Sequence, residues 1–429
     1  MNPRSRLSWA AVLAFALLPF QPTTAAEFYV HPDGHDAHPG TLAQPFASVT
    51  RAQEAAGPGD TVWLRGGSYV FSGTTIEIGV LLTKSGAEGK RINYWAYPNE
   101  TPVFDFHQLA TPVRIRGFSV KASWLHLRGL EVRGVQQILT NTNESWGIRV
   151  EGGSHNSFER LNLHHHEGPG FFIADGGDNL VLNCDSHHNY DPDKRGENAD
   201  GFGGHARQDG NVFRGCRAWS NSDDGFDLIH ARGVHRIEHC WAWSNGFVPD
   251  TDQRAGNGGG FKMGGWLLNP ARFPGHIAVH VIHHSLAFNN RAEGFNANYH
   301  PGLLRFYNNT AFNNPTQFNL KVAPRLTKPV THVLRNNVAL GAAPPLSGHE
   351  RNPPDDQFNS WNLETVTVTA EDFMSTEPKG VDGPRQPDGG LPELPFMRPK
   401  LGSRLLDAGI AVELPFKGPA PDLGAFEVK

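Results

Sequence analysis

The stretch Cys216-Arg217-Ala218-Trp219-Ser220-Asn221 returns a short interval later as Cys240-Trp241-Ala242-Trp243-Ser244-Asn245. Both copies read as a small residue, any residue, a small apolar residue, two further residues and asparagine. A pattern that returns at a regular interval of about 24 residues is typical of a chain built from stacked units. Three further copies, some separated by insertions, are Cys184-Asp185-Ser186-His187-His188-Asn189, Ser285-Leu286-Ala287-Phe288-Asn289-Asn290 and Asn309-Thr310-Ala311-Phe312-Asn313-Asn314.

Units of this length favour strands over helices. Helical repeats run to about 33 residues or more with a 3.6-residue apolar period, whereas these units alternate apolar and polar residues and are rich in Gly and Asn. The sequence therefore predicts an all-β fold, a parallel β-helix, whose inward side chains stack on those of the next coil about 4.8 Å away. We expect Cys184, Cys216 and Cys240 to form one interior column of buried free thiols, because directly stacked strands hold side chains too far apart for a disulfide. The asparagines that end the copies should form a second, structural column.

The first 26 residues differ from the rest. Arg4 and Arg6 precede an apolar run from Trp9 to Phe20 and then small residues. This order is typical of a cleaved signal peptide, and the run is shorter than the roughly 20 residues that a membrane-spanning helix needs. We therefore expect residues 1–26 to be removed and the mature protein to be secreted, into the periplasm or the medium.

Residues 27–429 should form a single domain. Of the 429 residues, 38% are apolar, enough for a large core, and no later segment is apolar enough to span a membrane. A short helix from Ser48 to Ala56 should cover the open N-terminal end of the solenoid, and residues from about 342 to 429 should form a C-terminal cap packed on it. The net charge of −5 gives no basic field for nucleic acid, and we expect a monomer.

Acidic residues concentrate in two segments, Asn198-Ala199-Asp200-Gly201-Phe202 and Ser222-Asp223-Asp224-Gly225-Phe226-Asp227. The segments are about one coil apart, so Asp200 should lie next to the Asp223 and Asp224 pair on the same edge. Carboxylates this close repel one another unless a cation lies between them, and Ca²⁺ fits a wide cage of oxygen ligands better than Mg²⁺. The alternative is a solvated acidic turn.

A single lysine follows in the longest excursion of the chain, from Gly246 to Gly275. It lies in Asn257-Gly258-Gly259-Gly260-Phe261-Lys262-Met263-Gly264-Gly265, where flanking glycines allow a ligand to come close. Alone, Lys262 could be an ordinary surface charge. Beside a metal site it becomes a candidate general base.

These motifs resemble those of family 9 polysaccharide lyases, the pectate lyases built on a right-handed parallel β-helix. The resemblance rests on Asn-Ala-Asp-Gly-Phe, Asp-Asp-Gly-Phe-Asp and Gly-Gly-Gly-Phe-Lys in this order and spacing, and extends to both ends of the mature chain, at Phe28-Tyr29-Val30-His31-Pro32-Asp33-Gly34 and Pro421-Asp422-Leu423-Gly424-Ala425-Phe426. It implies that Lys262 is the catalytic base. It also implies that Ca²⁺ is held by Asp200, Asp223, Asp224 and Asp227.

The resemblance thus implies a secreted, Ca²⁺-dependent pectate lyase that cleaves polygalacturonate-type pectin, an acidic plant cell-wall polysaccharide, by β-elimination to 4,5-unsaturated products. Three alternatives stay open. A rhamnogalacturonan I lyase would use the same chemistry. A β-helix glycoside hydrolase would use two of the four aspartates as acid and base and leave Lys262 without a role. A glycan-binding solenoid without activity would use its tryptophans as a sugar platform. Arg232, Arg254 and Arg291 are either clamps for substrate carboxylates or exposed charges.

Consecutive histidines occur at His164-His165-His166, His187-His188 and His283-His284. Neighbouring residues on a strand point to opposite faces, so we do not expect the members of one run to share a metal ion. The sequence favours polar turn and surface positions for them.

Overall fold

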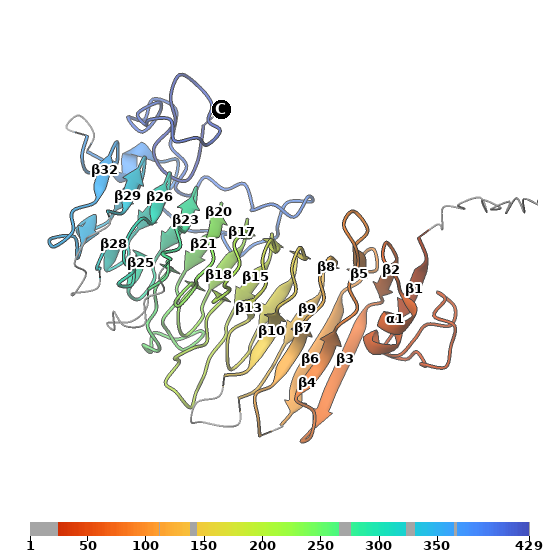
Figure 1. Ribbon diagram of the computed structural model, residues 1–429. Coiled ribbons are helices and arrows are strands. Elements are labelled where there is room, and N and C mark those ends of the chain that lie inside the picture. The colour runs from red at the N-terminus through yellow and green to blue at the C-terminus, as the bar shows by residue number, and fades with distance from the viewer. Residues whose placement is uncertain are drawn as a thin grey trace, which may run out of the picture.

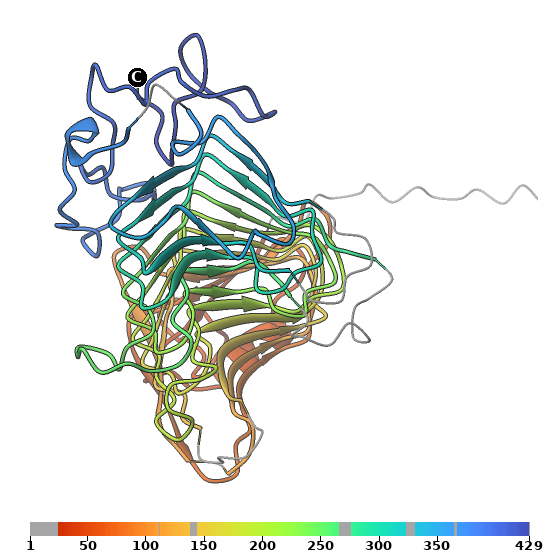
Figure 2. The ribbon, with the colours of Figure 1, turned by 90° about the vertical axis from the view of Figure 1, so that its left-hand side faces the viewer.

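Three long parallel sheets wind together into a β-helix (Figure 1). The computed structural model describes residues 25–110, 112–137, 144–265, 276–322, 331–363 and 367–428. In this part of the chain, sheet A has 12 strands and sheets B and C have 10 each, and every strand except the first and last of each sheet pairs with the strand one coil before and one coil after it. Figure 2 looks along the stack and shows the coils superimposed. The predicted all-β parallel β-helix is confirmed.

Sheet A begins at the N-terminus and runs the length of the molecule. Its strands are β1 (Glu27–Val30), β2 (Thr61–Leu64), β5 (Ile92–Ala96), β8 (Leu125–Arg128), β11 (Ser157–Glu159), β14 (Leu180–Leu182), β17 (Asn211–Arg214), β20 (His235–Glu238), β23 (Val281–His283), β26 (Arg305–Tyr307), β29 (Val333–Arg335) and β32 (Asp355–Gln357).

Sheet B follows sheet A in each coil. Its strands are β3 (Gly67–Gly73), β6 (Pro102–Leu109), β9 (Glu131–Arg133), β12 (Asn162–His164), β15 (Asp185–His187), β18 (Arg217–Trp219), β21 (Trp241–Trp243), β24 (Leu286–Phe288), β27 (Thr310–Phe312) and β30 (Val338–Leu340).

Sheet C completes each coil and carries the acidic segments. Its strands are β4 (Ile78–Leu82), β7 (Arg116–Val120), β10 (Trp146–Glu151), β13 (Phe171–Asp175), β16 (Phe202–Gly204), β19 (Phe226–Asp227), β22 (Phe261–Lys262), β25 (Glu293–Asn296), β28 (Thr316–Asn319) and β31 (Leu346–Ser347).

A column of phenylalanines inside sheet C fixes the register of its strands. The rings stack from coil to coil with centroids 4.8 to 5.1 Å apart, and the members are Phe202, Phe226, Phe261, Phe295 and Phe318. All five are fully buried or nearly so. Because successive side chains of a strand point to opposite faces, the residue after each phenylalanine must point outward.

Two polar columns hold the turns of consecutive coils together. Each asparagine of the predicted column donates its side-chain N–H to the side-chain oxygen of the next, at 2.8 to 3.0 Å, from Asn189 through Asn221, Asn245 and Asn290 to Asn314. The cysteine column continues into Ser285, whose hydroxyl accepts the backbone N–H of Cys240 at 3.2 Å. Cys184, Cys216 and Cys240 are buried free thiols. Both columns are confirmed.

The histidine pairs disagree with our expectation. In each pair the second residue has a left-handed backbone, with φ of 56° at His165, 55° at His188 and 49° at His284. This step turns the second ring back toward the side of the first. The two Nδ1 atoms then lie 2.7 Å apart in the first two pairs and 3.0 Å apart in His283 and His284. The expectation that neighbours in a run point apart was therefore wrong, because it assumed a continuous strand.

The two ends of the described chain pack on the helix differently. Helix α1 (Val49–Ala55) begins at Ser48, whose hydroxyl accepts the Arg51 N–H, and lies beside β1 and β4 at the N-terminal end. Residues after β32, including the 3₁₀ helix η2 (Ala370–Asp372), pack against the outer face of sheet B (Figure 2). Their apolar residues cover Trp241 and Trp243. The predicted signal peptide lies almost wholly outside the described residues, and no described helix is long and apolar enough to cross a membrane.

Candidate active site

The candidate site lies on the outer face of sheet C. Strands β16, β19 and β22 are consecutive neighbours there, and their register aligns Gly203, Asp227 and Lys262 in one outward column. Each follows an inward phenylalanine of the stacked column. The interior packing thus places Lys262 one coil above Asp227.

This position corrects one detail of the sequence analysis. Lys262 was expected within a long excursion, but the chain returns to the helix as β22, and Lys262 is a strand residue paired on both sides. A strand holds a side chain in place more firmly than a loop does. The Lys262 Nζ donates to Asp224 Oδ2 at 3.0 Å and to Asp227 Oδ2 at 2.9 Å.

All four aspartates named from the sequence are buried and close to one another, between 2% and 7% exposed. Carboxylate oxygens of Asp200, Asp224 and Asp227 all lie within 4.8 Å of one another. One coil separates Asp200 from Asp224, and Asp200 Oδ1 accepts the Asp224 N–H at 3.0 Å. The structure therefore brings Asp200, Asp224, Asp227 and Lys262 into one cluster.

Asp223 is placed differently from the other three. Both of its carboxylate oxygens accept backbone N–H groups, from Asn198 at 2.7 Å and from Asn257 at 2.6 Å. These bonds join the turns of three consecutive coils. Asp223 therefore holds the walls of the site together, whatever further ligand its oxygens take.

A glycine brings the backbone close to the cluster. The Gly259 N–H donates to Asp224 Oδ1 at 2.6 Å, and a Cβ atom at this position would lie only 3.0 Å from that oxygen. A larger residue would push the carboxylate away. On the other side of the same turn, Arg291 donates to the carbonyl oxygens of Gly256 and Asn257 at 2.5 Å. Arg291 thus supports the turn that carries Asn257.

The cluster holds more negative than positive charge. Burial and the nearby carboxylates of Asp223, Asp227 and Asp224 raise the pKa of Asp200 well above its usual range. Burial raises the pKa of Asp224 to about 8, although the ammonium of Lys262 opposes this. Burial would lower the pKa of Lys262, but the carboxylates around it, Asp224 first, outweigh burial and raise that pKa well above its usual range.

Such a cluster fits a divalent cation. Buried carboxylates that repel one another are stabilised by a hard cation with oxygen ligands, and Ca²⁺ accepts six to eight of these in flexible geometry. The donor set of Asp200, Asp224 and Asp227 consists of oxygen alone. Their raised pKa values show the same shortage of positive charge.

A cavity of about 310 Å³ opens beside the cluster. It is lined by Asp200, Asp223, Asp227 and Lys262 together with residues that the sequence analysis did not single out. The additional polar lining residues are Glu144, Glu197, Asn198, His205, His230 and Asn257. Asn198 and Asn257 begin two of the motifs and Glu197 precedes one of them, but only the coil register shows that Glu144 and the two histidines face the same cavity.

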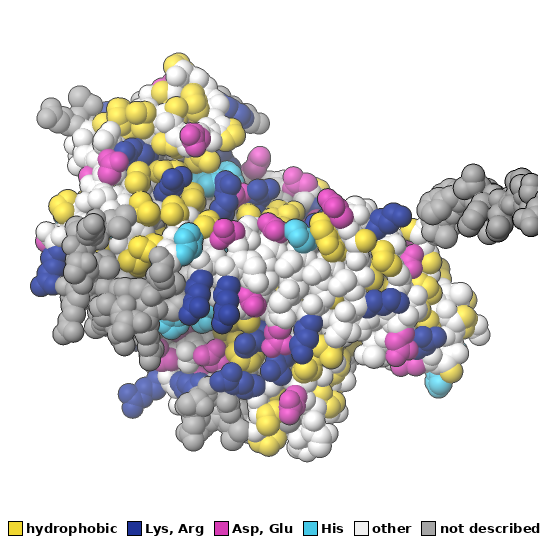
Figure 3. Space-filling view, viewed as in Figure 1, with side chains coloured by type: hydrophobic (Ala, Val, Ile, Leu, Met, Phe, Trp, Pro, Cys, Tyr) yellow, Lys and Arg dark blue, Asp and Glu magenta, His cyan; other side chains and the backbone are white. Residues whose placement is uncertain are grey.

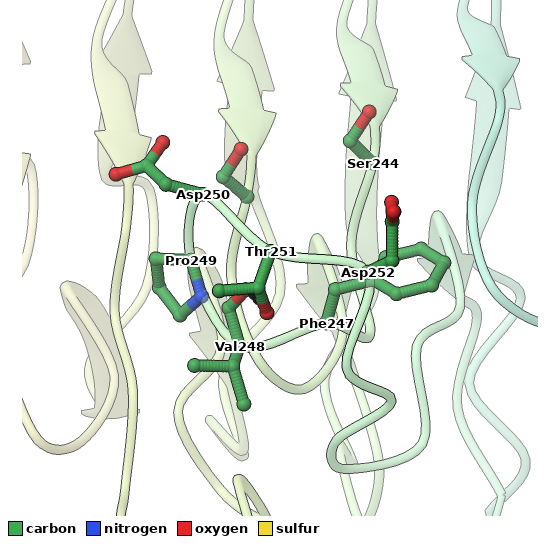
Figure 4. A pocket seen from close by; sticks show the side chains of 8 residues that line it. Ser244, Phe247, Val248, Pro249, Asp250, Thr251 and Asp252 are labelled. Carbon is green, nitrogen blue, oxygen red and sulfur yellow. Dashed lines mark hydrogen bonds between the residues drawn. The ribbon is translucent and has the colours of Figure 1, made fainter.

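A second cavity, of about 300 Å³, lies under the loop of residues 247–252 (Figure 4). Its walls include Ser220, Ser244, Asp250 and Asp252, and none of the residues that line it is a lysine or arginine. The carboxylates of this cavity repel an acidic polymer, and no lysine or arginine side chain in its lining offsets their charge. The cavity at Lys262 is therefore the candidate active site.

A sequence profile described as the Pel9A-like, right handed beta helix region matches residues 28–339. The chain belongs to the Pel9A-like β-helix family. Pectate lyase L of Dickeya chrysanthemi is 36% identical to this Pel9A-like chain over 416 residues, which cover 94% of this chain and 91% of the relative. Pectate lyase PEL9 of Emericella nidulans is 31% identical over 420 residues, 92% of this chain and 97% of the relative.

Two solved structures share the architecture of this Pel9A-like chain. The crystal structure of pectate lyase Pel9A aligns with a TM-score of 0.80 at 33% identity and covers 95% of this chain and 97% of its own. A rhamnogalacturonan lyase aligns with a TM-score of 0.82 at 35% identity and covers 89% of this chain and 98% of its own. The β-helix is therefore right-handed, and the Pel9A-like chain is a polysaccharide lyase of family 9.

Proposed function

We propose that the protein is a secreted, Ca²⁺-dependent pectate lyase that cleaves polygalacturonate by β-elimination. The observation that carries this proposal is the contact of the Lys262 ammonium with Asp224 and Asp227 inside a buried carboxylate cluster. It supports a cation site beside a candidate base, at a cavity on the surface of a polysaccharide lyase. Pectate lyase relatives support the choice of polymer.

The residues present suit removal of a proton next to a carboxylate. The C5–H of a uronate is weakly acidic, and Ca²⁺ held by Asp200, Asp223, Asp224 and Asp227 would stabilise the negative charge that develops when this proton leaves. Lys262 Nζ accepts the C5 proton. The electron pair of the C5–H bond forms the C4–C5 double bond, the C4–O4 bond breaks, and the leaving oxygen takes up a proton from water.

Lys262 can act as the base only as a neutral amine. In the structure its ammonium is held by Asp224 and Asp227, which raise its pKa. Asp224 and Asp227 would stabilise the Lys262 proton less if they held a divalent cation, and this would favour the neutral amine. The same carboxylates thus position Lys262 and couple its protonation to the cation.

A basic surface next to the site supports an acidic substrate. Lys and Arg side chains gather among carboxylates over the middle strands of sheet C (Figure 3). Arg149 of β10 lies over the Trp146 ring at 3.7 Å, and Arg116 of β7 pairs with Glu151. Both strands belong to the sheet that carries Lys262, a few coils before it.

A rhamnogalacturonan I lyase is the second candidate. A solved rhamnogalacturonan lyase resembles this chain as closely as Pel9A does, at 35% identity and a TM-score of 0.82. Both polymers contain galacturonate and can undergo the same elimination, so the cation cluster and Lys262 suit either. The walls of the cavity must therefore decide between them.

Two further alternatives fit the structure less well. A glycoside hydrolase of the common type needs a free acid and a free base. Asp224 and Asp227 are each paired with Lys262, and both carboxylate oxygens of Asp223 accept backbone N–H groups, which leaves Asp200 without a second free carboxyl group. On sheet B, Trp241 and Trp243 are covered by the C-terminal segment, and the half-buried Trp219 packs against the same apolar cluster. Trp266, a fourth candidate for a sugar platform, lies outside the described residues. Buried side chains cannot stack on a saccharide.

The experiment follows the ultraviolet absorbance of unsaturated uronides on polygalacturonate and on rhamnogalacturonan I, each with Ca²⁺ and with excess chelator. We expect chelator-sensitive absorbance on polygalacturonate. Absorbance on rhamnogalacturonan I alone would favour the second candidate. Absorbance that survives the chelator would contradict the Ca²⁺ requirement, and reducing ends without absorbance would contradict elimination. Secretion is tested separately by comparing the N-terminus of the exported protein with the predicted start at Glu27.

A further inference from the structure

Three histidines meet at the turns that end two neighbouring strands of sheet A. His239 follows β20, and in the next coil His283 ends β23 and His284 follows it. The His239 ring stacks on His284 with centroids 4.9 Å apart and presents its edge to His283 at 5.7 Å. One ring nitrogen of each of the three lies within 4.8 Å of the other two. The left-handed backbone of His239 and His284 produces this arrangement.

A carboxylate lies behind one of these rings. The Nε2 atom of His283 is 3.6 Å from Glu238 Oε1. Glu238 is itself held by Arg214 at 2.6 Å and by Arg236 at 3.0 Å. With the proton on Nε2, toward this anion, the Nδ1 lone pair of His283 faces the Nδ1 atom of His284. A carboxylate that orients the far nitrogen is the usual second partner of a metal-binding histidine.

Burial also suits a bound ion. His283 and His284 are 5% and 7% exposed, whereas His239 is exposed to solvent. The first two rings are therefore held in place, and the third leaves a way in. The Nδ1 atoms of His283 and His284 are 3.0 Å apart, close to the spacing of two imidazole nitrogens on one tetrahedral ion.

We propose that His239, His283 and His284 bind a divalent transition metal ion such as Zn²⁺, with water in the fourth position. Imidazole nitrogens select such ions, whereas the all-oxygen cluster at Asp200 suits Ca²⁺, so the two sites differ in chemistry. The ion would join the coil before residues 246–280 to the coil after them. The segment between these coils carries Lys262. The bound ion therefore cross-links two neighbouring coils of the β-helix. This role does not depend on the proposed function.

The chain offers a matched control. The pairs His164 and His165, and His187 and His188, show the same close Nδ1 contact, which a hydrogen bond between neutral rings also explains. In those pairs no group of three ring nitrogens lies within 4.8 Å among the described residues. The third imidazole and the carboxylate of Glu238 thus distinguish the trio.

The test uses variants that keep the turn geometry. His239→Asn and His284→Asn remove ligands, and Asn308 and Asn336 already occupy the same left-handed position in the next two coils, with φ of 49° and 59°. His165→Asn/His188→Asn is the control, because Asn289 and Asn313 occupy its position in later coils.

Chelator-stripped protein is titrated calorimetrically with Zn²⁺ in the presence of Ca²⁺, and with Co²⁺ while the visible spectrum is recorded. We expect one tight equivalent, tetrahedral Co²⁺ bands and a rise in Tm of about 2 °C or more at saturating Zn²⁺. The tight binding, the tetrahedral Co²⁺ bands and the rise in Tm should all be lost in His239→Asn and in His284→Asn. All of them should be kept in the control. Glu238→Gln should weaken binding about 10- to 100-fold. Absence of a tight equivalent, equal binding by all variants, or loss in the control alone would overturn the proposal.

Discussion

Lys262 lies directly over Asp227. The two residues are partners in the register of β22 and β19, and Lys262 Nζ is 2.9 Å from Asp227 Oδ2. Because each follows a stacked phenylalanine, Phe261 over Phe226 at 4.8 Å, the core of the helix fixes the distance between the candidate base and the carboxylate cluster. The position of the base is thus a property of the fold.

Replacement of the base should abolish turnover. We expect Lys262→Ala to lower kcat by about 10²- to 10⁴-fold, the usual contribution of a positioned general base. Lys262→Arg is the matched control, because it keeps the charge and the contacts with Asp224 and Asp227 but does not release a proton at working pH. Initial rates of unsaturated product formation measure both variants. Near-normal rates in either would contradict the role of Lys262.

The aspartates should separate into two kinds. Asp227→Asn keeps an oxygen that can accept the Ile229 N–H and removes one negative charge from the crowded cluster, so the Ca²⁺ concentration for half-maximal activity should rise while Tm changes little. Asp223→Asn places an amide N–H against a backbone N–H of Asn198 or Asn257, so stability should fall by about 1–3 kcal/mol as well. Calcium titration and thermal unfolding measure the two effects. Equal losses of Tm in both variants would contradict this distinction.

The asparagine column should contribute strongly to stability. Asn245 accepts from the Asn221 backbone and side chain and donates to Ala218 and Asn290. Asn245→Ala leaves several buried groups without partners and should destabilise the fold by about 1–3 kcal/mol or more. Thr251→Ala, on an exposed loop, should cost no more than about 0.5 kcal/mol. Denaturant unfolding compares them, and equal midpoints would contradict a stabilising column.

Much of this architecture could be predicted from the sequence. The asparagine and cysteine columns repeat one residue type at one position of successive coils. The repeat in the sequence therefore predicts which residues of neighbouring coils are in contact. The four aspartates and Lys262 lie next to Gly-Phe steps that mark the same strand in three coils. Their grouping therefore follows once the coil length is known.

Other features could not be predicted this way. The strand position of Lys262 depends on where the chain re-enters the helix after Asn245, and insertions there have no fixed length. The shared side of His283 and His284 depends on one left-handed residue, which no period-2 pattern reveals. His205 and His230 face the cavity because of coil register alone. In each case the position of the side chain depends on backbone conformation that the repeated pattern does not specify.

Acid should weaken the fold through buried histidines. Burial lowers the pKa of His235 and of His300 from 6.5 to about 4, and that of His332 to about 3. The unfolded chain then binds more protons than the folded one between about pH 6.5 and pH 4, so stability is full above this range and falls as the pH drops through it. Protonation of His235 and of His300 should each lower the free energy of unfolding by about 3 kcal/mol over this range. Tm measured against pH tests this, and His235→Gln should flatten the dependence; a Tm independent of pH over this range would contradict it.

Elimination at the Lys262 site can be distinguished from hydrolysis by the mass of the products made in isotopically labelled water. Elimination breaks the C4–O4 bond without adding water to the new non-reducing end. We expect oligosaccharides whose unsaturated end makes them one water lighter than hydrolysis products, with no label incorporated by cleavage. The protein should form them, and Lys262→Ala should not. Products of full hydrolytic mass that carry one labelled oxygen for each bond cleaved would contradict it.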